Sequence, residues 1–79
     1  RYNKRVLLYA AVRNDFLARL RRRDPVSAAL SGEPQVSALS QRLGMAPELI
    51  RAALQTPASY DKATFRERVS TLIHMRNHL

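Results

Sequence analysis

The chain of 79 residues carries 14 Lys and Arg against 6 Asp and Glu, which gives a formal net charge of +8. This length suits a single small domain with a modest core. Because the chain has no cysteine, disulfides and thiolate metal sites are excluded. The longest apolar run, residues 6–12, is far shorter than the ~20 residues needed to cross a bilayer. Since residue 1 is not Met, we expect further sequence upstream.

The positive charge is concentrated near the start of the chain. Residues 1–23 hold eight Lys and Arg against one Asp, for a net +7. Residues 24–57 hold two Arg against three acids, for a net −1. Residues 58–79 hold four Lys and Arg against two acids, for a net +2. The basic character therefore belongs mainly to the first predicted element.

The periodicity of the first segment predicts a helix over about residues 4–22. Its apolar side chains recur at helical spacing, and Asp15 and Arg19 are spaced as an i,i+4 ion pair. Pro25 ends this helix because the residue before a proline avoids the α region. Asp24 is then placed to cap a short helical turn. The apolar stripe is formed by Val6, Tyr9, Val12, Phe16 and Leu20, widened by Leu8 and Leu17.

The middle of the chain, about residues 34–55, reads as a helix-turn-helix-like pair. Pro34 is expected to open its first helix, and Gly44 to end it, because glycine reaches a positive φ without steric cost. Pro47 suits the first turn of the second helix, where a backbone N–H would have no partner. A last helix is predicted over about residues 62–77, after Asp61 as its cap.

These elements predict an all-α fold for the single domain 1–79. It is a compact four-helix domain with a short extra helical turn and a helix-turn-helix-like central pair. The first and last helices are expected to pack around that pair. The predicted core comprises Val12, Phe16, Leu20, Leu39, Leu43, Met45, Ile50, Ala53, Leu54, Phe65, Val69, Leu72 and Ile73.

We find no residue pattern with the spacing of a catalytic site. The only two glycines are too far apart to form a phosphate-binding loop. His74 and His78 share a helix face at a spacing that suits two imidazoles on one metal. They lie at the end of a helix without a His-Glu-x-x-His signature, so we interpret them as incidental. We therefore expect a non-enzymatic protein with no catalytic residue, cofactor or metal.

Two features bear on binding. The run Arg21 to Arg23 fits a solvated helix end, contact with nucleic-acid phosphates, or a segment beside an anionic membrane. If the second helix of the central pair entered a DNA major groove, Glu48, Arg51 and Gln55 would be its reading residues. Arg51 would suit guanine and Gln55 would suit adenine. Nucleic-acid binding is thus the alternative hypothesis.

Three segments resemble the C-terminal cytoplasmic region of an uncharacterised bacterial inner-membrane family. They are LARLRRR at residues 17–23, LSQRLGMAPELIRAAL at residues 39–54 and YDKATFRERVSTLIHMRNHL at residues 60–79. Genes of this family are commonly encoded beside MoxR-type AAA+ ATPases and von Willebrand A-domain proteins. The resemblance implies a cytoplasmic domain, tethered to the inner membrane by a segment outside these 79 residues, that docks an AAA+ ATPase. It carries no catalytic motif.

The sequence thus predicts a protein-interaction domain that docks a protein partner through a basic helical face. We expect the domain itself not to span a membrane. The predicted partner-binding residues are Arg13, Arg19, Arg21, Arg22, Arg23, Arg66 and Arg68.

Overall fold

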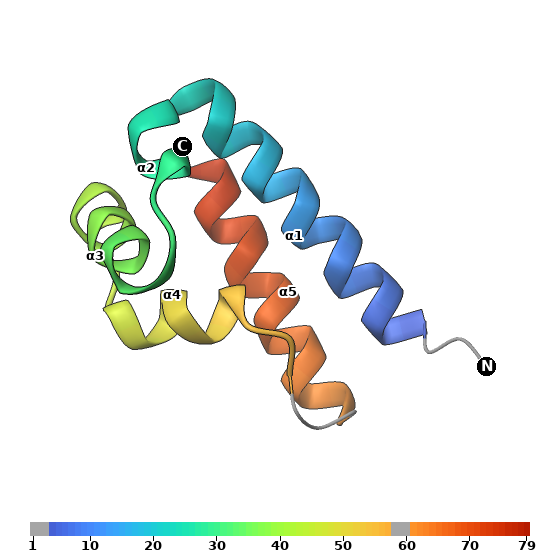
Figure 1. Cartoon of the computed structure of the whole chain (residues 1–79). Helices are drawn as coiled ribbons and strands as arrows, with labels where there is room; N and C mark the ends of the chain where they lie inside the picture. Colours follow the sequence, from blue (N-terminus) through green and yellow to red (C-terminus); the bar gives the residue numbers. More distant parts are fainter. Residues whose placement is uncertain (1–3, 58–60) are drawn as a thin grey trace.

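The computed structural model describes residues 4–57 and 61–79. In these two ranges the chain forms helices and no strand, which confirms the predicted all-α class (Figure 1). The domain measures 37 × 22 × 20 Å. Its elements are α1 (Lys4–Arg23), α2 (Pro25–Ala29), α3 (Gly32–Leu43), α4 (Pro47–Leu54) and α5 (Lys62–Asn77).

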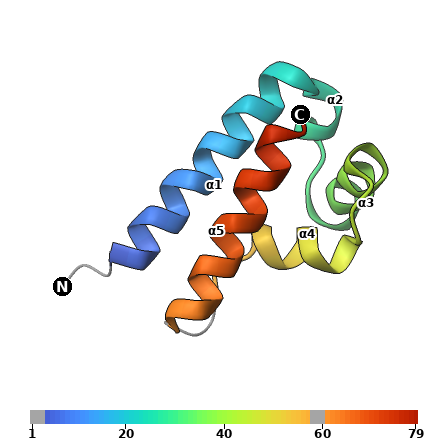
Figure 2. The ribbon, with the colours of Figure 1, turned by 180° about the vertical axis from the view of Figure 1, so that it is seen from behind.

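The two longest helices, α1 and α5, lie side by side and run in the same direction (Figures 1 and 2). Near their starts, the rings of Tyr9 and Phe65 meet edge to face, with centroids 6.1 Å apart. Near the end of α5, an Arg76 Nη lies 2.7 Å from the carboxylate of Asp15, in the second half of α1. The salt bridges among the described residues do not include the predicted pair of Asp15 and Arg19, and Asp15 pairs with Arg76 of the neighbouring helix instead.

Helix α2 is a single capped turn between α1 and α3. Asp24 caps it as predicted, accepting hydrogen bonds from the Ser27 backbone N–H at 3.2 Å and from the Ser27 hydroxyl at 2.6 Å. These bonds, chiefly the one from the hydroxyl, lower the pKa of the Asp24 carboxyl below its ordinary value. Arg42 of α3 lies 3.6 Å from the same carboxylate, which links α3 to the end of α1.

The turn between α3 and α4 has the predicted geometry. Gly44 adopts the left-handed conformation, with φ of 66°, and its N–H donates to the Ser40 carbonyl at 2.9 Å. The Ser40 hydroxyl donates to the Met45 carbonyl at 2.6 Å. Helix α3 begins at Gly32, two residues before the predicted start at Pro34. Proline is tolerated in the first helical turn, since its missing N–H is not needed there.

Buried side chains from α1, α3, α4 and α5 form one core cluster. Three of its members, Tyr9, Val36 and Met75, were absent from the predicted core. Ile73 was predicted to be buried but is 38% exposed, because it lies one residue around the helix from the core-facing Leu72. Others that were predicted as core, Val12, Leu43, Met45, Leu54 and Val69, are only partly buried against this cluster. The cluster contains Tyr9, Phe16, Leu20, Val36, Leu39, Ile50, Ala53, Phe65, Leu72 and Met75.

Candidate functional site

Two of the predicted partner-binding arginines, Arg13 and Arg68, turn toward the end of α4. Arg13 Nε donates to the Leu54 carbonyl at 2.9 Å, and an Arg68 Nη donates to the Ala52 carbonyl. The buried Tyr9 hydroxyl donates to the carbonyl between them, that of Ala53, at 2.7 Å. The last carbonyls of a helix have no partner within the helix, so these three donors fasten α4 to α1 and α5.

The other five predicted arginines lie at two separate places. Arg21, Arg22 and Arg23 are exposed on the last turn of α1, where the helix dipole favours cations. Arg19 lies one turn earlier and is partly buried, with no hydrogen-bond partner for its Nε in the described part of the chain. Arg66 lies near the start of α5, beside the start of α1. Arg66 lines the same groove as Arg5, and at 1.5 Å per residue about 24 Å of α1 separates Arg5 from Arg21. The seven predicted arginines therefore do not share one place. Their partner-binding role stays a prediction.

The predicted DNA-reading residues lie on or just after α4. Glu48 and Gln55 are exposed. Arg51 forms a two-pronged ion pair with Glu33 of α3, through Nε at 2.7 Å and an Nη at 2.6 Å. These hydrogen bonds lower the pKa of Glu33 and raise the pKa of Arg51. Arg51 would have to leave this pair to contact a base, and its reading role stays a prediction.

His74 and His78 contact each other at the end of α5. Their ring centroids are 4.2 Å apart, and His78 Nδ1 lies 2.8 Å from the His74 carbonyl oxygen. Within residues 4–57 and 61–79, no group of three or more His, Asp or Glu side chains is placed to hold a metal ion.

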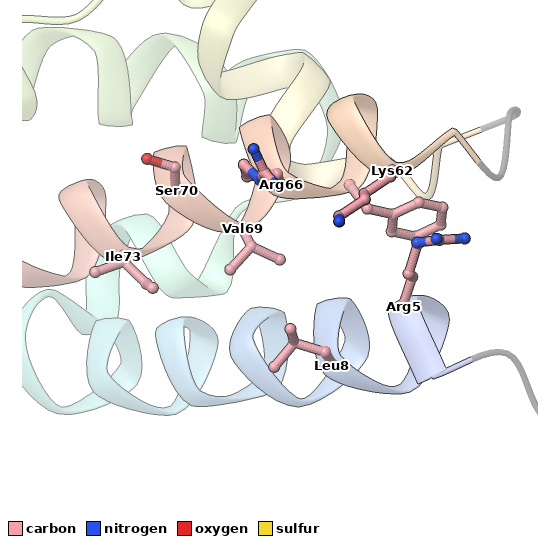
Figure 3. A pocket seen from close by; sticks show the side chains of 8 residues that line it. Arg5, Leu8, Lys62, Arg66, Val69, Ser70 and Ile73 are labelled. Atoms are coloured by element: carbon pink, nitrogen blue, oxygen red, sulfur yellow. The ribbon is translucent and has the colours of Figure 1, made fainter.

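A groove of about 430 Å³ that the sequence did not predict lies between α1 and α5 (Figure 3). We call it the α1/α5 groove. In Figure 3 Leu8 lies on α1 across from Val69 of α5, and the side chain of Val69 points toward α1. Leu8 is 56% exposed and Ile73 is 38% exposed, so aliphatic surface faces solvent here. The groove is lined by Arg5, Leu8, Lys62, Phe65, Arg66, Val69, Ser70 and Ile73.

The charge along this groove is uneven and of one sign. Arg5, Lys62 and Arg66 line the end where both helices begin, and no lining residue is acidic. The salt bridges among the described residues involve neither Lys62 nor Arg66. Because α1 and α5 are parallel, the positive ends of their helix dipoles also lie at this end. The groove therefore combines an aliphatic floor with a cationic end.

A signal for this groove was present in the sequence. Lys62, Arg66, Val69 and Ile73 recur at spacings of four, three and four, so they share one face of a helix. This face lies beside the face of the same helix that carries Phe65 and Leu72 into the core.

None of the described helices is long and apolar enough to cross a membrane. Comparisons of the chain with family models, with curated proteins and with solved structures gave no match.

Proposed function

We propose that this domain is a non-enzymatic binding module that docks a protein partner through a basic helical face formed by α1 and α5. The observation that carries the proposal is the α1/α5 groove, in which exposed aliphatic side chains lie next to Arg5, Lys62 and Arg66. Contiguous exposed apolar surface with a polar rim is typical of an interaction site. The family resemblance implies an AAA+ ATPase as the partner, at the cytoplasmic face of the inner membrane.

The two parts of this face have different roles in binding. The aliphatic floor supplies affinity, because its burial removes apolar surface from water at about 25 cal/mol per Å². The cations raise the association rate and the selectivity of binding, since exposed charges steer an oppositely charged partner and repel others. At physiological salt this attraction extends over a Debye length of about 8 Å. Binding should therefore weaken as salt rises and still persist in part.

The first experiment identifies the partner by crosslinking in the native host. A photocrosslinking amino acid replaces Ser70, which is exposed and lines the groove. The control position is Ser37, which is exposed on α3. We expect a protein, identified by mass spectrometry, to crosslink at position 70 and not at position 37. Equal crosslinking at both positions, or crosslinking only to nucleic acid, would contradict the proposal.

The second experiment measures the affinity of the identified protein for purified variants. Reversing two groove cations, Lys62→Glu with Arg66→Glu, should weaken binding by about tenfold or more, equivalent to ~1.4 kcal/mol. The matched control, Arg21→Glu with Arg22→Glu, makes the same charge change at the other end of α1 and should have a much smaller effect. Circular dichroism checks that both variants keep the parent helix content. A larger effect from the control pair would move the docking surface to that end of α1.

A further inference from the structure

We propose that the occupant of the α1/α5 groove is an amphipathic helix that carries an aliphatic ridge and a cluster of carboxylates near one end. This inference rests on the proposed function and names the chemistry of its partner.

The length of the groove suits a helix. Along α5 it runs from Lys62 to Ile73, which is about 16 Å at 1.5 Å per residue. A helix presents apolar residues at i, i+3 or i+4, and i+7, and these span about 10 Å along its axis. Three such side chains fit within the groove, where they would contact Leu8, Val69 and Ile73.

The charges specify where the carboxylates of this helix must lie. The cations Arg5, Lys62 and Arg66 are gathered at the end where α1 and α5 begin, and the other end is lined by Ser70 and Ile73. Carboxylates near that end of the bound helix would meet Lys62 and Arg66, whereas acids spread evenly along it would not. Glutamate or aspartate pairs well with Arg in charge-assisted hydrogen bonds.

The rim also argues against a second copy of this chain as the occupant. A symmetric dimer places the same patch on both subunits. Because no lining residue is acidic, a second copy would offer no groove carboxylate to pair with Lys62 and Arg66. An acidic partner supplies those carboxylates.

The test selects ligands from a displayed library of random peptides of about 16 residues, a length of about 24 Å as a helix. We expect enriched peptides to share an apolar i, i+3 or i+4, i+7 pattern with Asp and Glu biased toward one end. When bound to the protein, they should shift the amide resonances of Leu8, Val69 and Ile73. Enriched peptides that lack this pattern, or an absence of enrichment, would overturn the inference.

The variant Leu8→Asp should weaken a selected peptide by about tenfold or more, since it places a like charge on the groove floor. Its control is Leu49→Asp on α4, where the parent residue is 50% exposed against 56% for Leu8. The control should bind as the parent does. Replacing the peptide's Glu by Gln should remove most of the salt dependence. Equal weakening by the two variants would also overturn the inference.

Two further measurements test the other occupants. Vesicles of phosphatidylcholine with phosphatidylserine are sedimented with the parent and with Leu8→Asp, and sedimentation equilibrium gives the oligomeric state of the parent. Vesicle binding or dimerisation that depends on Leu8, without peptide binding, would overturn the inference. If the host protein crosslinks at position 70 but the selected peptides lack acidic helical character, the proposed function stands and this inference fails.

Discussion

Replacing Tyr9 with Phe tests whether the end of α4 is fastened by side-chain donors. The change deletes one hydroxyl from a residue that is 2% exposed and keeps the ring that packs against Phe65. In the parent, that hydroxyl donates to the Ala53 carbonyl at 2.7 Å. The variant leaves this carbonyl buried beside a phenyl ring, without its donor.

The expected cost follows from the burial of the orphaned carbonyl. A buried acceptor that loses its partner costs about 1–3 kcal/mol. Small domains have roughly 0.05–0.15 kcal/mol of unfolding free energy per residue, so the loss is a large share of the total. For a domain of this size, each kcal/mol lowers Tm by roughly 4–8 °C.

The assay is denaturant and thermal unfolding of the parent and of Tyr9→Phe, followed by circular dichroism. A difference in unfolding free energy below about 0.3 kcal/mol at neutral pH would refute the reasoning, because it would mean that the hydroxyl satisfies nothing. Alkaline pH gives a second readout. Burial raises the pKa of Tyr9 above its ordinary value of 10.0, so its contribution is complete below pH 10.0 and is lost as pH rises through the raised pKa. The gap between parent and variant should therefore narrow above that pH.

Two further predictions concern the turn and the cap. Gly44→Ala should destabilise the domain by about 1–2 kcal/mol, because an L side chain is strained at a φ of 66°. Nothing lies within 4 Å of the new Cβ, so the loss comes from the backbone alone, and Gly44→Asn should recover part of it. Equal stability of all three proteins in urea would contradict the left-handed turn. Asp24→Asn should lower Tm at neutral pH, and the difference should vanish in acid. The pKa of Asp24 is depressed below its ordinary value of 3.8, so the stability that its charge contributes is present above that pH and is lost as pH falls through the depressed pKa. A difference in Tm that persists at pH well below 3.8 would show that the charge is not involved.

The helices and their boundaries follow largely from local chemistry, so they could be predicted from the sequence. Asp24 and Asp61 cap helices because a short carboxylate reaches the free N–H groups of the next turn. Gly44 ends α3 because its φ excludes most other residues. These effects act within a few residues of the chain, and the predicted last helix has the same bounds as α5.

The roles of the arginines were decided only by the tertiary structure. Arg66 and Arg68 are two residues apart on one helix, yet Arg68 bonds to the end of α4 and Arg66 lines the α1/α5 groove. Arg13 turns inward for the same reason as Arg68, since carbonyls at the end of α4 lie within its reach. No local pattern indicates where those carbonyls lie, because the distance along the chain from Arg13 to Leu54 is 41 residues.

The candidate site depends on tertiary structure for a related reason. Hydrophobic spacing indicated that α5 has an apolar side, and Ile73 was assigned to the core on that basis. In the packed domain Phe65 and Leu72 enter the core, whereas Ile73 stays at the surface and lines the α1/α5 groove. The sequence by itself determined the helices, their caps and the excess of positive charge. The direction in which α1 and α5 pack decided which aliphatic and cationic side chains meet in one groove, because that contact joins residues more than 50 positions apart.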